Sequence, residues 1–202
     1  MTHGFVYSAI VSLINLDTTS FLQSSISRPS ASGLILGFLT GHAFEGFILG
    51  IIFELVILDF PPIGGMPVPN GCIAVGISCY LVSIADAGFS FFAGLIGGIL
   101  YSYVEMILRS RRKIFNRAVE KSILSFRFSV GRFVFLSLMI EFLVALIYVY
   151  SFSLCLKWFF SKLSLDLSYR VKQWLELSLI STVFITLTSM VFKFLTQVRK
   201  NA

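Results

Sequence analysis

One apolar stretch constrains the fold of this chain more than any other feature. Residues 133–156 contain a single charged side chain, Glu141. A helix needs about 20 predominantly apolar residues to cross the hydrocarbon core of a bilayer, and this stretch is long enough. Residues 174–194 form a second such stretch, rich in Leu, Ser and Thr. The two stretches predict transmembrane helices and therefore an all-α, polytopic membrane protein.

The amount of polar surface excludes a soluble globule. Only 13% of the 202 residues are charged, and 56% belong to the hydrophobic set. Soluble domains carry roughly 25% charged residues, so this chain has too few to cover a water-facing surface. We expect a single membrane domain over residues 1–202.

The front part, residues 1–108, is expected to consist of broken or re-entrant helices. Residues 5–16 are apolar but too short to cross a bilayer as a helix, since spanning takes about 20 residues. Residues 33–60 are interrupted at 41–46 by the sequence GHAFEG, and residues 71–108 are too long for one crossing. We expect the latter to turn near Asp86, Ala87 and Gly88. About five or six membrane segments result, some of which are not full spans.

Glycines recur at four-residue spacing in this front part. Gly33, Gly37 and Gly41 form one series, and Gly46 and Gly50 form another. On a helix, such a stripe of small residues lets another backbone approach closely. The spacing predicts close packing of helices.

Basic residues are concentrated in one segment, residues 109–132, which holds eight of the 16 Lys and Arg. The positive-inside rule places this segment, expected as a loop, in the cytoplasm. The loop 157–172 then lies outside, between the two helices of the C-terminal part 133–202. Membrane topology explains the positive charge, so we expect no nucleic-acid partner.

The backbone is broken most thoroughly after residues 54–59, where an apolar run gives way to PPIGGMPVPN. Prolines cannot donate backbone hydrogen bonds, and within a membrane such irregular backbone persists only inside protein or beside a water-filled cavity. Transporters use broken helices of this kind to bind polar solutes near the bilayer midplane. Glu54, and in the same way Asp59, would lie on the helix that leads into the break, where a carboxylate can accept hydrogen bonds from sugar hydroxyls. An ordinary Pro/Gly turn at the membrane surface, with Glu54 snorkelling or paired, is the open alternative.

Several short motifs together resemble a known family. In order along the chain they are Leu16-Asp17, Gln23, Ser27-Arg28-Pro29, the glycine-spaced helix, Glu54-Leu55 and the loop PIGGMPVPN. This series resembles the N-terminal half of enzyme IIC of the mannose/fructose/sorbose family of the phosphoenolpyruvate-dependent sugar phosphotransferase system. The resemblance extends from about residue 16 to residue 78, and more loosely through IFNRAVEKS.

The resemblance implies a membrane subunit that binds a hexose and presents it for phosphorylation inside the cell. Its partners would be the cytosolic IIA and IIB phosphocarrier proteins, the membrane subunit IID and the lipid bilayer, and an oligomer is expected. No cofactor, metal or intrinsic catalysis is implied. The implied sugar-binding residues are Gln23, Arg28, Glu54 and Asn70, with Pro67 and Pro69 shaping the loop.

The chain also departs from the family pattern. Family members carry a second Gly/Pro break that mirrors the first, whereas residues 174–194 contain neither Gly nor Pro. The second repeat is thus reduced, the loop has PVPN where Pro-Pro-Asn is usual, and His42 stands where an Asp is frequent. A non-transporting membrane scaffold is therefore an alternative function. An intramembrane enzyme is a third reading, because His42 and Glu45, at positions i and i+3, could face the same side and share a metal ion or a proton.

Overall fold

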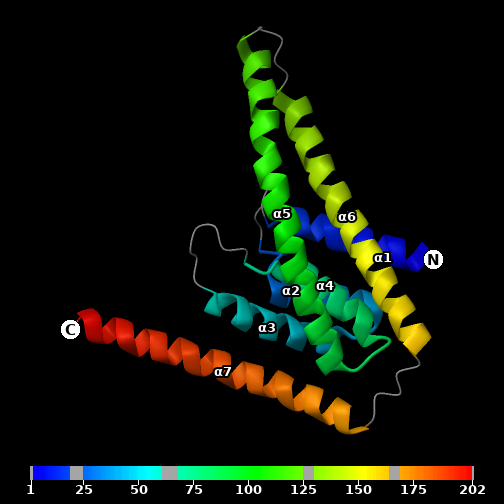
Figure 1. Cartoon of the computed structure of the whole chain (residues 1–202), viewed down its shortest axis with the longest axis vertical. Coiled ribbons are helices and arrows are strands. Elements are labelled where there is room, and N and C mark those ends of the chain that lie inside the picture. Colours follow the sequence, from blue (N-terminus) through cyan, green and yellow to red (C-terminus); the bar gives the residue numbers. More distant parts are fainter. Residues whose placement is uncertain (1, 19–24, 61–67, 125–129, 164–168, 202) are drawn as a thin grey trace.

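The computed structural model describes residues 2–18, 25–60, 68–124, 130–163 and 169–201. These residues form seven helices and no strand, which confirms the all-α prediction. The helices are α1 (Thr2–Leu16), α2 (Pro29–Thr40), α3 (Ala43–Asp59), α4 (Gly71–Val82), α5 (Ala87–Leu124), α6 (Val130–Leu163) and α7 (Tyr169–Asn201). Figure 1 shows α5 and α6 as the long upright pair, with α7 crossing beside the lower end of the molecule.

Helices α2 and α3 form a tight hairpin at the interruption predicted from the sequence. Gly41 ends α2 with a φ of 80°, a left-handed conformation that glycine adopts without strain. The glycine stripe lies between the two helices, as predicted. A Cβ atom added to Gly33 would lie 2.3 Å from the carbonyl oxygen of Gly46, and one added to Gly50 would lie 2.2 Å from that of Pro29. Only glycines allow the two backbones to come this close.

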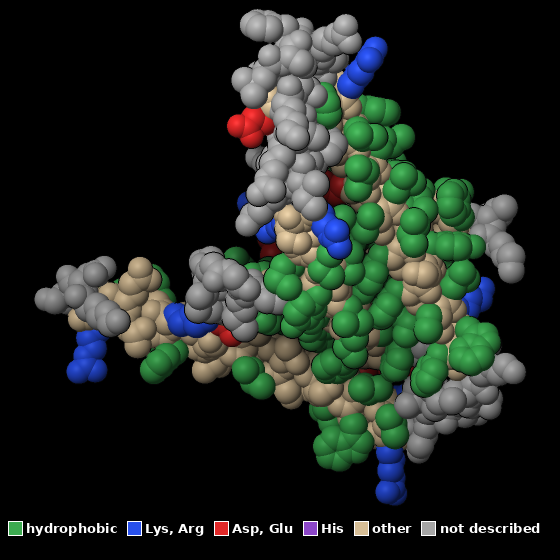
Figure 2. Space-filling view, turned by 45° about the horizontal axis from the view of Figure 1, so that its top comes forward, with side chains coloured by type: hydrophobic (Ala, Val, Ile, Leu, Met, Phe, Trp, Pro, Cys, Tyr) green, Lys and Arg blue, Asp and Glu red, His purple; other side chains and the backbone are tan. Residues whose placement is uncertain are grey.

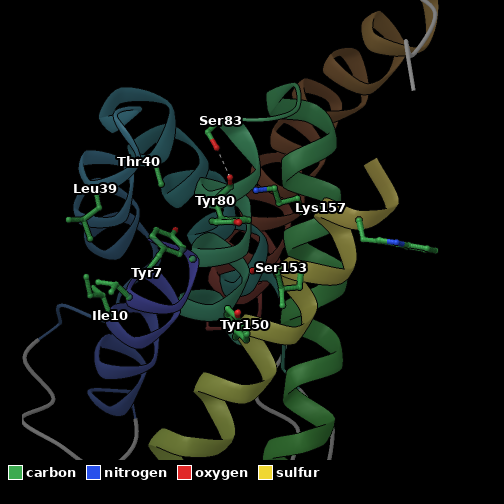
Figure 3. Close-up of a pocket in the computed structure, with 13 residues that line it drawn as sticks. Tyr7, Ile10, Leu39, Thr40, Tyr80, Ser83, Tyr150, Ser153 and Lys157 are labelled. Atoms are coloured by element: carbon green, nitrogen blue, oxygen red, sulfur yellow. Dashed lines mark hydrogen bonds between the residues drawn. The ribbon is translucent and has the colours of Figure 1, made fainter. Parts of the chain in front are cut away.

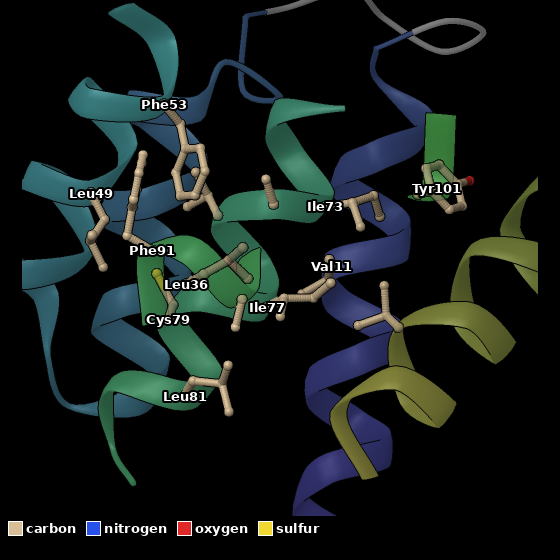
Figure 4. Close-up of a cluster of buried hydrophobic side chains, with 14 of the residues drawn as sticks. Val11, Leu36, Leu49, Phe53, Ile73, Ile77, Cys79, Leu81, Phe91 and Tyr101 are labelled. Carbon is tan, nitrogen blue, oxygen red and sulfur yellow. The ribbon is translucent and has the colours of Figure 1, made fainter. Parts of the chain in front are cut away.

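Helix α4 is the central helix of the fold. It is followed by a turn and by α5, which begins at Ala87, so the predicted turn near residues 86–88 is confirmed. Ser78 of α4 donates a hydrogen bond to the carbonyl oxygen of Ser90 on α5 at 2.8 Å. Figure 4 shows side chains of α1, α2, α3 and α5 converging on α4, with Ile73 and Ile77 in the middle. The hydrophobic core therefore lies mainly in the front part of the chain, and Ala145 and Val149 of α6 also belong to it.

The basic segment 109–132 is not the loop that the sequence suggested. Helix α5 continues through Leu124 and α6 begins at Val130, so most of the segment is helical. Loop prediction from charge alone failed here because Lys and Arg are good helix formers, and no helix-breaking residue precedes Leu124 after Gly98.

Three helices in the described part of the chain are long and apolar enough to span a membrane. The segments are Ala87–Arg111, Gly131–Phe159 and Arg170–Arg199. They include both apolar stretches on which the prediction of a membrane protein rested, whereas α1, α2 and α4 are shorter apolar helices. Figure 2 shows a broad outward-facing surface of hydrophobic side chains, as expected of a protein that faces lipid.

Candidate functional site

A buried network of polar side chains connects α1, α4 and α5. Asn70 is the N-cap of α4, and its side-chain oxygen accepts a hydrogen bond from the backbone N–H of Ile73 at 3.1 Å. Its amide nitrogen donates to Oδ1 of Asn15 at 2.9 Å and to Oε1 of Glu105 at 3.4 Å. Asn is a preferred N-cap because it pairs a backbone donor that the helix leaves free. Asn70 thus both begins the central helix and holds the network together.

Tyr101 and Glu105 contribute the α5 side of the network. The side-chain amide of Asn15 donates to the hydroxyl of Tyr101 at 3.3 Å, and both residues are fully buried. Glu105 also lies 3.5 Å from the guanidinium of Arg109, one helical turn further along α5. Glu141 of α6, which is 4% exposed, lies close enough to act electrostatically on Tyr101. A charged or polar residue inside a membrane segment is usually paired and functional.

A second pair of candidate residues lies where α2 begins and α3 is about to end. The guanidinium of Arg28 is 4.0 Å from the carboxylate of Glu54. The Arg28 side chain is 67% exposed and the Glu54 side chain 29% exposed. At this distance and exposure the ion pair is weak, so neither side chain is fixed by the other.

The network and the ion pair lie at the same end of the helical body. A Cβ atom added to Gly71 would lie 2.5 Å both from the ring of Pro29 and from the side chain of Ile57. Gly71 follows Asn70 and Pro29 follows Arg28, so the starts of α2 and α4 meet beside the last turn of α3. Of the six residues implied by the resemblance, the structure describes Arg28, Glu54, Pro69 and Asn70. Gln23 and Pro67 lie outside the described residues.

A protein-family model described as the sorbose-specific IIC component of the phosphotransferase system matches residues 3–184. The chain belongs to this family. It is therefore a membrane subunit of a sugar transport system. The match covers the network and the ion pair, together with about the first half of α7.

A solved structure supports the fold of this IIC chain. The chain is similar to a protein described as "Structure of membrane protein", with a TM-score of 0.69 and 19% sequence identity. The alignment covers 96% of this chain and 80% of the other. A search of curated proteins gave no match.

The sequence reasoning missed three members of the network, which are Asn15, Tyr101 and Glu105. Two of them carried a readable signal. Asn15 is a strongly polar residue within the apolar segment 5–16, and Glu105 is an acid near the end of the apolar segment 71–108. Either residue is costly in a membrane without a partner. Tyr101 carried no such signal, because tyrosine is common in membrane helices.

The pair considered for metal or proton chemistry lies at the start of α3, where His42 is the N-cap and Glu45 is in the first turn. Nδ1 of His42 is 3.7 Å from Oε1 of Glu45. Within the described ranges no cluster of three or more His, Cys, Asp or Glu side chains could hold a metal ion. Both side chains are more than one-third exposed. The geometry therefore supplies one contact and no buried reaction site.

Proposed function

We propose that this IIC chain binds a hexose within the plasma (inner) membrane, which it crosses several times, and presents the sugar to a IIB partner for phosphorylation. The observation that carries the proposal is the position of Asn70, which the resemblance to the family implied as a sugar ligand. Asn70 lies at the centre of a buried hydrogen-bond network with Asn15 and Glu105. Such convergent polar groups in apolar surroundings are typical of small-molecule sites.

The side chains of the network match the chemistry of a sugar. Each sugar hydroxyl both donates and accepts a hydrogen bond, the Asn side chains do both, and the Glu105 carboxylate accepts. In the structure these groups bond to one another, and the Asn15 amide donates to the Tyr101 hydroxyl. A bound hexose would exchange these bonds for bonds to its own hydroxyls, so no buried donor or acceptor is left unpaired.

Partner binding is proposed for the basic end of α5. The helix continues for more than ten residues beyond the candidate span that ends at Arg111. This extension, residues 112–124, contains four of the eight basic residues of the segment 109–132. We place it in the cytoplasm, where it would dock an acidic face of IIB. Such docking should weaken with salt, because exposed charges are screened within about 8–10 Å at physiological ionic strength. IID would complete the translocator within an oligomer.

The proposal is tested by replacing Asn70 with Ser in the full chain purified in detergent. Ser retains an oxygen that can cap α4, because Ser and Asn are comparable N-caps, but it removes the amide donor. Binding of radiolabelled hexoses, measured by equilibrium dialysis, should fall at least about tenfold, since a good polar contact to a ligand is worth about 1.5 kcal/mol or more. The thermal midpoint should also fall, because Oδ1 of Asn15 loses its buried donor, so binding is compared at a temperature well below both midpoints. Unchanged hexose binding would remove Asn70 from the site.

Glu54→Gln provides an independent test of the second pair of candidates. If the Arg28–Glu54 pair has a structural role, Glu54→Gln should destabilise the protein. If Glu54 binds sugar, Glu54→Gln should reduce hexose binding and leave the stability unchanged. The exposure and the 4.0 Å separation of the pair favour the second result, with a stability change below about 1 kcal/mol. Full hexose binding by the variant would show that the loop after α3 is only an architectural break.

A scaffold role is a second candidate function, favoured by the structure of α7. This helix runs without a break from Tyr169 to Asn201, and only 6% of its apolar span window is buried. A helix of this kind offers a surface to partners but no broken backbone to bind a solute. Hexose uptake by membranes that contain the chain with IIA, IIB and IID distinguishes the two functions. A transport subunit should lose uptake when Asn70 is replaced. A scaffold should still assemble with IID, and replacement of Asn70 should not change uptake.

A further inference from the structure

A cavity of about 810 Å³ lies at the opposite end of the helical body from the polar network. Its walls come from the first half of α1, the end of α2, the end of α4 and the last third of α6. Figure 3 shows Tyr7 and Ile10 on one side of the cavity and Tyr150, Ser153 and Lys157 on the other. The candidate sugar-binding residues lie at the other ends of α1, α2 and α4. The cavity is therefore a separate site.

One wall of the cavity carries a hydroxyl group without a hydrogen-bond partner. Ser153 lines the cavity and is 4% exposed. Its Oγ is the one buried side-chain N or O atom in the described part of the chain that makes no hydrogen bond. By contrast, Ser151 on the same helix donates to the carbonyl oxygen of Tyr148 at 3.1 Å. An unpaired buried hydroxyl costs about 1–3 kcal/mol, so a ligand that accepts its hydrogen bond would be stabilised there.

The rest of the lining combines a cation, aromatic rings and an apolar wall. Lys157 and Trp158 are at the C-terminal boundary of the candidate span Gly131–Phe159, which is where a bilayer changes from hydrocarbon to headgroups. Trp and Tyr are enriched at that depth, and a Lys there attracts anionic lipid headgroups. Ile10 and Leu39 provide apolar surface on the side of the cavity opposite Lys157 (Figure 3).

We infer that this cavity binds an anionic phospholipid, with the lipid phosphate at Lys157 and Ser153 and the first part of an acyl chain against Ile10 and Leu39. The phosphate oxygens accept hydrogen bonds from the ammonium and from the unpaired hydroxyl. The lipid would then fill the space between α1 and α6 and hold the two helices at a fixed separation. This lipid site is independent of the proposed hexose site, because the two share no residue.

Tryptophan fluorescence measures the binding directly. Trp174 is the second of the two tryptophans, so Trp174→Phe leaves Trp158, at the cavity wall, as the only reporter. The delipidated full chain in detergent is titrated with brominated phosphatidylglycerol or with brominated phosphatidylcholine, which quench a nearby indole. We expect tighter binding of phosphatidylglycerol. Lys157→Gln should weaken it about fivefold, as one surface cation is worth about 1 kcal/mol toward an anionic lipid, with phosphatidylcholine binding unchanged.

Arg170→Gln is the matched control, because it removes an exposed cation outside the cavity. It should leave both titrations unchanged, whereas Ser153→Ala should weaken phosphatidylglycerol binding. Equal quenching by the two lipids, or equal phosphatidylglycerol affinity in Lys157→Gln and Arg170→Gln, would overturn the inference. Millimolar inorganic phosphate serves as a competitor. Displacement of the lipid by phosphate would identify a site for soluble anions and would also overturn the assignment to a lipid.

Discussion

At the scale of single residues, the fold depends on a few polar side chains placed where water is absent. In a bilayer every buried donor or acceptor must find a partner within the protein. Asn70 uses its oxygen to begin α4 and its nitrogen to reach Asn15 and Glu105. The same atoms therefore serve folding and the proposed sugar binding, and mutations must separate the two roles.

Tyr101→Phe on α5 measures how much the polar network contributes to folding stability. The change removes only the hydroxyl that accepts the Asn15 amide at 3.3 Å. A buried donor left without an acceptor costs about 1–3 kcal/mol, so we expect a lower apparent thermal midpoint in detergent. Tyr103→Phe is the matched control on the same helix, because Tyr103 is 47% exposed. Equal midpoints for the two variants would mean that the contact between Asn15 and Tyr101 contributes no stability.

The sequence predicted part of this site. The order of short motifs supports the resemblance that implies Asn70, Arg28 and Glu54 as sugar ligands, which stays a prediction, and the structure places Arg28 beside Glu54. The contact between Asn70 and Glu105 was not predictable, because it joins residues 35 positions apart through the packing of α4 on α5. The spacing of apolar residues along α5 and the composition of the chain do not indicate which face of α5 packs against α4.

At the scale of helices, the spacing of glycines and the position of Pro/Gly clusters predicted the helix boundaries better than the distribution of charge did. The glycine spacing in residues 33–50 and the Pro/Gly clusters correctly indicated where helices break and pack. The prediction of a loop over residues 109–132 was wrong, because positive charge indicates the side of the membrane and not the backbone conformation. The extent of α5 follows instead from the absence of helix-breaking residues.

Gly33→Ala tests the close packing of the α2–α3 hairpin. The added methyl would meet the carbonyl oxygen of Gly46 at 2.3 Å, and backbone cannot move aside as a flexible side chain can. We expect destabilisation of about 1–3 kcal/mol from overpacking, seen as a lower midpoint. Gly131→Ala on α6 is the control, because a Cβ there meets nothing within 4 Å. It should be neutral or stabilising by up to about 1 kcal/mol. A harmless Gly33→Ala would contradict the packing account.

The contact between α3 and α7 predicts a specific coupling. Lys193 donates to both the carboxylate and the backbone carbonyl of Asp59, and Ser189 donates to the carboxylate at 2.7 Å. Hydrogen bonds from Lys193 and then from Ser189 lower the pKa of Asp59 below its usual 3.8. The stabilisation is thus present above pH 3.8 and is lost as the pH falls through the lowered value.

A double-mutant cycle of Asp59→Asn and Lys193→Gln measures this coupling. We expect the double variant to be little less stable than either single variant, with a coupling of at most about 1 kcal/mol because both side chains are partly exposed. The coupling should be constant between about pH 5 and pH 8, where Asp59 stays ionised. Additive single effects, or a coupling that changes within that window, would show that the Asp59–Lys193 contact does not help to hold α7 on α3.

At the scale of the whole molecule, the two ends of the helical body carry different chemistry. One end has the polar network, the Arg28–Glu54 pair and the basic extension of α5. The other end has the cavity with Lys157 and Trp158. Glu105 lies one helical turn before Arg109, so the network is near the basic end of the α5 span. The proposed phosphorylation by a cytosolic partner would require a bound sugar to be reachable from that end.

Orientation is therefore the prediction on which both proposed sites depend. The positive-inside rule places the end of α5 in the cytoplasm, since eight of the 16 basic residues lie in 109–132 and four lie in 157–172. Glu120 is exposed on α5 beyond the candidate span. In a Cys155→Ser background, which removes the exposed native thiol, Glu120→Cys should react with a membrane-impermeant maleimide in inverted vesicles but not in intact cells.

Arg170→Cys, at the opposite end of the molecule, should give the reverse pattern, so each variant controls for the reactivity of the other. The remaining cysteines, Cys72 and Cys79, are buried and should stay unlabelled in the folded protein. Labelling of Glu120→Cys in intact cells would invert the orientation. The network would then face outward, where IIB cannot reach a bound sugar, and the lipid cavity would lie in the cytoplasmic leaflet. Cytoplasmic labelling would instead place the hexose site on the side where its phosphoryl donor is found.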